Sequence, residues 1–147
     1  MLSNTCKYGI RALLYLAQNA KENERIGIKK IAEGLNIPTP FLGKILQVLA
    51  KNKVISSTKG PNGGFGIGKD PHDITLYDIV VMLDGDDLFT MCLIGSGDCD
   101  ESHSGSYFCP AHDKFSPIKE QIINFFESET IGGLIDNLEK SGRKIRM

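Results

Sequence analysis

The sequence predicts a mainly α-helical chain with one small β-hairpin, arranged as a winged helix-turn-helix domain and a long C-terminal dimerisation helix. Three observations support this: two short amphipathic segments joined by the turn NIPTP, a glycine-rich hairpin pattern directly after them, and an apolar helical pattern near the C-terminus. We expect three parts within the 147 residues. The winged domain spans 1–84, a cysteine-rich loop spans 85–112, and the dimerisation helix with a C-terminal tail spans 113–147.

The helix-turn-helix is the first part of this prediction. Ser3 is placed to cap a helix whose apolar positions recur at helical spacing: Ile10, Leu13, Leu14 and Ala17. A second, short helix follows through Ile28, Ile31, Ala32 and Leu35. The third, PFLGKILQVLAKN, opens on a proline and has an inner stripe of Leu42, Ile45, Leu46 and Leu49. Its opposite face gathers Pro40, Gly43, Lys44, Gln47 and Lys51.

The segment VISSTKGPNGGFGIGKD reads as strand, turn and returning strand, which is the wing of a winged helix. Lys59 stands at its tip beside Gly60, Asn62, Gly63 and Gly64, where backbone amides can approach phosphates without an intervening side chain. A nucleotide-binding loop is the rival interpretation. The glycine spacing fits neither nucleotide fingerprint, and the segment lies between two strands, so we reject it.

The C-terminal half predicts three further helices. Thr75 caps ITLYDIVVMLDG, the segment DKFSPIKEQIINFFESE follows the cysteines, and TIGGLIDNL closes the fold before the basic segment EKSGRKIRM. The apolar residues of the middle helix spread over more than one stripe: Ile118, Ile122, Ile123, Phe125 and Phe126. Such a helix needs two covering surfaces, of which one is its own domain and the other is a second subunit or, alternatively, the same chain.

Composition and charge restrict the function. No segment reaches the ~20 apolar residues of a membrane span and the N-terminus lacks a signal-peptide pattern, so we expect a cytoplasmic protein without a membrane partner. Residues 1–69 hold 11 Lys and Arg against 3 Asp and Glu, a balance of +8. Residues 70–113 hold 10 acidic and no basic residues, a balance of −10. The basic part suits a polyanion such as DNA, unless both regions are merely solvated faces.

Three cysteines and a histidine lie in the polar loop, in the order Cys92-x6-Cys99-x9-Cys109-x2-His112. Three thiolates and an imidazole suit tetrahedral zinc or an iron–sulfur cluster, and in a cytoplasmic protein clustered cysteines favour metal or redox chemistry. The long gaps favour a cluster over zinc, whose ligands usually come in close pairs. Thiol–disulfide sensing is a third interpretation. Cys6 is either a small buried residue or, in a dimer, a ligand or redox mate for the partner's loop.

The chain resembles the IscR/NsrR-type (Rrf2) superfamily of bacterial winged-helix regulators. The residues that carry the resemblance are CKYGIRALLYLA, FLGKILQVL with the following GPNGGFGI, DITLYDIVVMLDG, and CPAH with TIGGL. It implies a dimer that binds operator DNA and holds an iron–sulfur cluster on Cys92, Cys99 and Cys109, with His112 as the fourth ligand. In other branches the fourth ligand comes from the partner's first helix, near Cys6 and Lys7 here.

This sequence departs from the family in its longer x6 and x9 gaps and in the insertion DESHSGSY, which adds His103. The type of cluster, two-iron or four-iron, and the identity of the fourth ligand therefore stay open.

We accordingly predict a homodimeric, sequence-specific DNA-binding transcriptional regulator whose operator affinity depends on an iron–sulfur cluster. The third helix enters the major groove, where base contacts come from Thr39, Pro40, Gly43, Lys44 and Gln47. The wing, through Lys59 and the amides of Gly60 to Gly64, holds the DNA backbone or the minor groove. A cluster-free thiol sensor, a zinc-stabilised interaction module and an electron-transfer protein are the alternatives. His72 and His103 have no recognisable nucleophile beside them, so we do not expect an enzyme.

Overall fold

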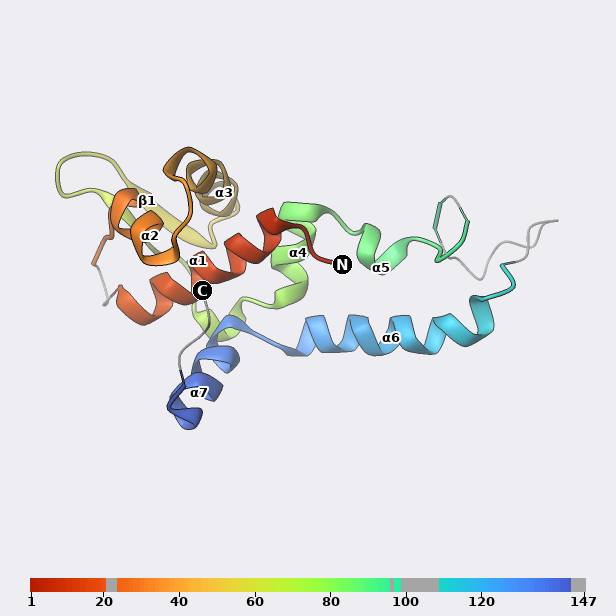
Figure 1. Cartoon of the computed structure of the whole chain (residues 1–147). Helices are drawn as coiled ribbons and strands as arrows, with labels where there is room; N and C mark the ends of the chain where they lie inside the picture. Colours follow the sequence, from red (N-terminus) through yellow and green to blue (C-terminus); the bar gives the residue numbers. More distant parts are fainter. Residues whose placement is uncertain (21–23, 96, 99–108, 144–147) are drawn as a thin grey trace.

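The computed structural model describes residues 1–20, 24–95, 97–98 and 109–143. Figure 1 shows α1, α2, α3 and the β-hairpin gathered at one end of an elongated molecule, while α6 runs away from them towards the cysteine loop. The elements in chain order are α1 (Asn4–Asn19), α2 (Ile28–Leu35), α3 (Thr39–Lys51), β1 (Ile55–Thr58), β2 (Gly64–Ile67), the 3-10 turn η1 (Pro71–Asp73), α4 (Leu76–Asp84), α5 (Asp87–Thr90), α6 (His112–Ser128) and α7 (Ile131–Ser141).

Helix α1 is the centre of the core. It contacts α2, α3, α4, α7 and β2, and its buried residues occupy most of its circumference: Cys6, Gly9, Ala12, Leu13, Leu14 and Leu16. The predicted stripe is therefore only partly correct, because Ile10 and Ala17 at its centre are half-buried, whereas Leu13 and Leu14 on either side of them are buried. A stripe argument assumes one covered face, whereas several elements cover this helix at once.

Ser3 caps α1 as predicted and also joins it to α4. Its Oγ accepts a hydrogen bond from the Cys6 N–H at 3.0 Å, a type of cap that contributes about 1 kcal/mol. The Ser3 hydroxyl and backbone N–H both donate to the carboxylate of Asp84, the latter at 2.9 Å. The carboxylate thus lies at the positive end of the α1 dipole. Helix α4 approaches so closely that a Cβ at Gly9 would collide with Leu83.

The helix-turn-helix prediction is confirmed. Asn36 ends α2 in the left-handed conformation, with φ 53°, and Pro38 and Pro40 flank the start of α3. The predicted inner stripe of α3 is buried in full, each residue exposing 2% or less: Leu42, Ile45, Leu46 and Leu49. The turn therefore fixes α3 with its polar face outward.

The wing is an antiparallel hairpin of β1 and β2, in which Ile55 pairs with Ile67 and Thr58 with Gly64. The linker before α2 adds a third, one-residue strand, because Ile26 and Phe65 exchange backbone hydrogen bonds at 2.8 and 2.9 Å. A Cβ at Gly64 would lie 2.6 Å from the Ile26 carbonyl oxygen, and its φ of +146° also favours glycine. The glycine-rich pattern thus lets the linker lie against the hairpin.

The C-terminal half departs from the sequence prediction in three places. A short helix, α5, lies inside the segment predicted as loop, and α6 begins one residue early, at His112. Helix α7 continues to Ser141, so that the first residues of the predicted tail are helical. Thr75 and Thr130 cap α4 and α7 and pair as an isolated β-bridge. Within the described residues, no helix has the length and apolarity needed to cross a membrane.

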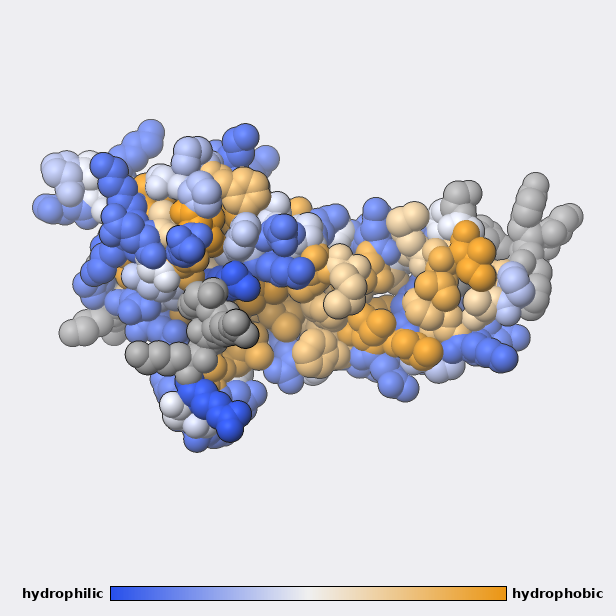
Figure 2. Space-filling view, viewed as in Figure 1, coloured by the Kyte–Doolittle hydropathy of each residue, from blue (hydrophilic) through white to orange (hydrophobic). Residues whose placement is uncertain are grey.

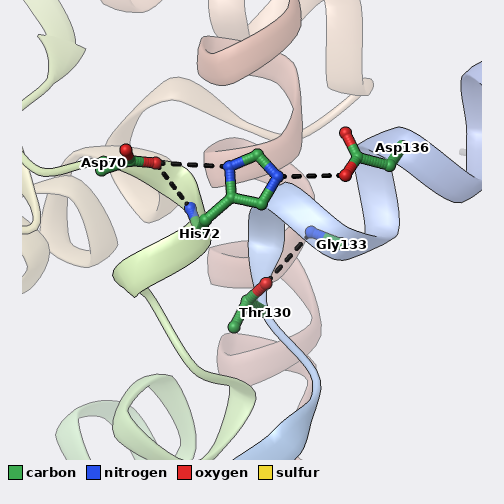
Figure 3. Close-up of polar contacts among 5 residues, drawn as sticks. All are labelled: Asp70, His72, Thr130, Gly133 and Asp136. Atoms are coloured by element: carbon green, nitrogen blue, oxygen red, sulfur yellow. Dashed lines mark hydrogen bonds and ion pairs between the residues drawn. The ribbon is translucent and has the colours of Figure 1, made fainter.

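His72 joins the base of the wing to α7 (Figure 3). Its side chain is 58% exposed, but both ring nitrogens face carboxylates. Nδ1 lies 3.3 Å from Asp70 Oδ1 and Nε2 lies 3.0 Å from Asp136 Oδ2. Its ring packs against the backbone of α7, where a Cβ at Gly132 would collide with it. The hydrogen bonds to Asp136 and then to Asp70 raise the pKa of His72.

We call the contacts of His72 with Asp70 and Asp136 the His72 clamp, and we expect this clamp to make the stability of the fold depend on pH. Because folding raises the pKa of His72, its stabilisation is complete below the ordinary histidine pKa of about 6.5 and is lost as the pH rises through the folded-state pKa. Asp136→Asn should therefore lower the urea midpoint at about pH 5.5 and have little effect at about pH 9. Asn137→Ala on α7 serves as the control. A midpoint difference that stays constant with pH would contradict the clamp.

Candidate functional site

The outward face of α3 is polar and accessible. Pro40, Lys44 and Gln47 are exposed, and Thr39 and Gly43 are half-buried beside them. All five lie near the N-terminal half of the helix, which is where recognition helices contact base edges. The structure therefore presents the predicted base-reading residues on one surface.

An aromatic side chain that sequence reasoning missed borders this face. Phe41 is 41% exposed on the first turn of α3, and its ring meets Tyr8 of α1 edge-on, with 5.7 Å between centroids. The guanidinium of Arg11 lies 5.8 Å from the centroid of the same tyrosine ring. The signal in the sequence was a large apolar residue just off the inner stripe.

The wing tip is a tight turn with an exposed lysine. Lys59, Gly60 and Asn62 are exposed, and the Gly63 N–H donates to the Gly60 carbonyl at 2.9 Å. Arg25, from the linker before α2, reaches the wing, its Nε lying 3.4 Å from Thr58 Oγ1. The linker thus brings a second cation to the wing, at Thr58, which the sequence pattern did not reveal.

Two of the predicted sulfur ligands lie together. The Sγ atoms of Cys92 and Cys109 are 3.5 Å apart, and the Gly95 N–H lies 3.3 Å from Cys92 Sγ. The Cys92 N–H donates to the Gly97 carbonyl at 2.9 Å, which closes a short turn at the start of the loop. Cys99 and His103 lie outside the described residues.

The thiol pair fits a metal as well as a disulfide. Two sulfurs on one tetrahedral metal, each about 2.3 Å from it, lie about 3.8 Å apart, close to the observed 3.5 Å. His112 opens α6, and its N–H donates to the Cys109 carbonyl at 3.0 Å. Across the described parts of the chain, these residues do not gather three metal-binding side chains around one point.

Cys6 differs in kind from the loop cysteines. Its thiol is fully buried at the start of α1, and burial, with a smaller effect of the Asp84 charge, raises its pKa to about 12. The thiolate needed for ligation or exchange is therefore disfavoured. This position favours a core role for Cys6 over a role as ligand or redox mate.

Lys119 is a further residue that sequence reasoning missed. Its side chain is buried in α6, and Nζ donates to the carbonyls of Thr90 at 3.0 Å and Met91 at 3.1 Å. It thereby ties α6 to the residue that precedes Cys92. The signal was a lysine placed i, i+4, i+7 with Ile123 and Phe126 on an apolar helix face.

Apolar side chains remain uncovered on α6 and on the nearby loop. Ile118 and Phe125 are each 52% exposed, and Leu93 and Ile94 are 59% and 66% exposed. Figure 2 shows hydrophobic (orange) surface on the right-hand half of the molecule, where Figure 1 draws α5 and α6. An uncovered apolar surface of this kind is typical of a protein–protein interface.

Comparisons with known proteins agree with this geometry. The profile of the Rrf2 family, described as "Iron-dependent Transcriptional regulator", matches residues 2–137. The chain is 37% identical over 140 residues to a protein of Aquifex aeolicus that is named as an HTH-type transcriptional regulator, covering 95% of this chain and 94% of that protein. It is 30% identical over 146 residues to the HTH-type transcriptional regulator IscR of Klebsiella pneumoniae, covering 97% and 86%.

The fold is also known. The structure of CymR, the global cysteine regulator of Bacillus subtilis, superposes with a TM-score of 0.77 at 20% identity, covering 93% of this chain and 97% of that one. At this identity the likeness establishes the winged-helix fold. The profile and the sequence relatives show that the chain belongs to the Rrf2 family of transcriptional regulators, which agrees with the expectation that it is not an enzyme.

Proposed function

We propose that the protein is a cytoplasmic, homodimeric, sequence-specific DNA-binding regulator whose operator affinity is controlled by an iron–sulfur cluster. The observation that carries the sensing part is the pair of thiols, Cys92 and Cys109, held 3.5 Å apart at the start of α6. A polar loop gives these cysteines no core to join, so a shared ligand is the simplest reason for their convergence.

The ligands of the cluster would be Cys92, Cys99, Cys109 and His112. When bound, the cluster supplies a centre that is sensitive to redox state, nitric oxide and iron supply. The chain itself contributes the Gly95 N–H, 3.3 Å from Cys92 Sγ, because an amide directed at a ligating sulfur stabilises its negative charge. His112 opens α6, so the last ligand is also the first residue of that helix.

The same thiols support a second candidate, a thiol–disulfide sensor without a cluster. A disulfide needs an S–S distance of about 2.05 Å. The Sγ atoms of Cys92 and Cys109 are 3.5 Å apart, so they must move about 1.5 Å closer. An oxidant such as peroxide would take two electrons as the two thiols lose their protons. One zinc bound by the same ligands is the third candidate, and it would make the loop purely structural.

DNA binding rests on α3 and the wing. The polar side chains of α3, above all Lys44 and Gln47, would contact base edges in the major groove. Lys59 and the amides of the wing tip would hold phosphates. The N-terminal half supplies the positive charge that such contacts need, a balance of +8 over residues 1–69.

Dimerisation would use the outward face of α6. Ile118 and Phe125 lie seven residues apart on that face, and each leaves half of its side chain exposed. The Rrf2 resemblance also implies a dimer, and two recognition helices at a fixed spacing are what a palindromic operator requires.

The cluster is tested first, by anaerobic purification with a visible absorption spectrum and iron, sulfide and zinc analysis. We expect a coloured protein with matching iron and sulfide. Cys92→Ala and Cys109→Ala should lose the iron, whereas the buried Cys6→Ala should keep it. A colourless protein with one zinc per chain would support the structural site, and neither metal would leave the thiol sensor.

A phosphate contact by the wing predicts a change in salt dependence. With an operator selected from random duplex DNA, Lys59→Ala should weaken binding to all sequences alike. It should also lower the slope of log K against log salt by about one. Lys140→Ala removes the same charge from α7, away from the wing (Figure 1), and should leave the slope unchanged. An unaltered slope in Lys59→Ala would exclude the contact.

The proposed dimer surface predicts a change in self-association. Phe125→Glu should weaken dimerisation by at least about tenfold, since large aromatic residues commonly dominate interface energy. Asn124→Glu adds the same charge at an exposed position about 100° around α6 from Phe125 and should have little effect. Sedimentation equilibrium measures both. A Phe125→Glu variant as dimeric as the wild type would place the interface elsewhere.

A further inference from the structure

We infer that Lys119 is the positioning residue through which the cysteine loop controls α6, and hence the dimer and the spacing of the recognition helices. The inference rests on the proposed function, because it concerns how the state of the thiol site reaches the rest of the molecule. It assigns a coupling role to a residue that is neither a ligand of the cluster nor a contact to DNA.

The burial of Lys119 is the first argument. It is 9% exposed, on a helix whose apolar residues are mostly half-exposed. Lysine is almost never buried unless its ammonium group is hydrogen-bonded. Here Nζ is bonded to the Thr90 and Met91 carbonyls. These are the carbonyls of the last residue of α5 and of the residue that caps it.

The position of these bonds along the chain is the second argument. Met91 immediately precedes Cys92, so Lys119 holds the start of the loop against α6. Cys109 is held at the other end, since its carbonyl accepts from the N–H of His112, the first residue of α6. His112 and Lys119 are two helical turns apart, about 10.5 Å along the axis. Both arms of the loop are therefore fixed to α6, one on each side of its internal proline, Pro117, and their two thiols lie 3.5 Å apart.

The faces of α6 give the route outward. Lys119, Ile123 and Phe126 form the stripe that faces α4 and α5, where Phe126 meets Phe89 edge-on with 5.4 Å between ring centroids. Ile118 and Phe125 form the adjoining stripe, which is exposed. A displacement of Met91, when the two thiols gain or lose a shared ligand, therefore acts on Lys119. It then turns or shifts the outward stripe, because Ile118, Lys119 and Phe125 all lie on the part of α6 that follows Pro117.

The consequence is separable from simple stability. If Lys119 only stabilises the fold, its loss weakens all forms of the protein alike. If Lys119 couples the cysteine loop to α6, its loss leaves DNA binding intact. The metal-loaded and metal-free forms then bind the operator with the same affinity. The measured quantity is thus the ratio of operator dissociation constants of the two forms, and not either constant alone.

The test is Lys119→Met, which keeps the length of the side chain and removes its charge and donors. We expect the ratio of operator dissociation constants, metal-free over metal-loaded, to fall to within about twofold of one while non-specific DNA binding is unchanged. Lys114→Met, on the exposed part of the same helix, should keep the wild-type ratio. A wild-type ratio in Lys119→Met would overturn the inference.

A second measurement separates this inference from the proposed function. The measurement is amide hydrogen exchange in the metal-free chain. We expect Lys119→Met to lose protection from exchange at two places together: the Cys92 amide, which is bonded to the Gly97 carbonyl, and the first turns of α6. Unchanged exchange at Cys92 would overturn the tether even if the wild type binds no cluster. Suppose that the wild type itself has a ratio of operator dissociation constants of one, and that Lys119→Met still loses amide protection at both places. The proposed control by the cluster is then refuted, whereas the attachment of the loop to α6 by Lys119 is supported. If Lys119→Met fails to fold, Lys119→Gln, which keeps two N–H donors, should give an intermediate ratio and exchange.

Discussion

The burial of α1 is the constraint on which the rest of the structure depends. Five elements pack on this one helix, and small residues such as Gly9 and Ala12 allow them to approach. Because protein interiors are packed nearly as densely as crystals, the orientation of α1 fixes α3 on one side and α4 on another. The base-reading face, the wing and the helix that leads to the cysteines are thus set by a single core.

The two ends of the molecule are held together by different physics. Around α1, large apolar side chains are removed from water, and the hydrophobic effect suffices to define the structure. Around the cysteines, the chain between 92 and 109 is rich in Gly, Ser and Asp and has little to bury. At the described ends of this segment the contacts are directional bonds, namely the thiol pair and the hydrogen bonds of Lys119. Bonds of this kind can be made and broken by chemistry, which a hydrophobic core cannot.

Basic and acidic residues are also separated along the chain. The basic residues of the first half include ones on α1, α2, α3 and the wing, whereas the acidic segment begins at the base of the wing with Asp70. There the negative charge is partly used within the fold, since Asp70 and Asp136 hold His72 between η1 and α7 (Figure 3). Asp84 serves likewise at the start of α1. The acidic segment therefore does more than balance the net charge of the chain.

Periodicity and turn chemistry, which are local properties, determined the helix-turn-helix, the hairpin and the caps Ser3 and Thr75 from sequence alone. They also placed the candidate base-reading residues on one face of α3, because a helix wheel needs no tertiary information. Only the tertiary structure decided which residues far apart in the chain meet. It brought Arg25 to the wing, Phe41 to Tyr8, His72 to Asp136, and Lys119 to the carbonyl beside Cys92. A sequence pattern reports the face on which a residue lies, but the partner on that face depends on how the helices pack. For the same reason the thiol spacing suggested a shared ligand, whereas the 3.5 Å separation of Cys92 and Cys109 came only from the fold.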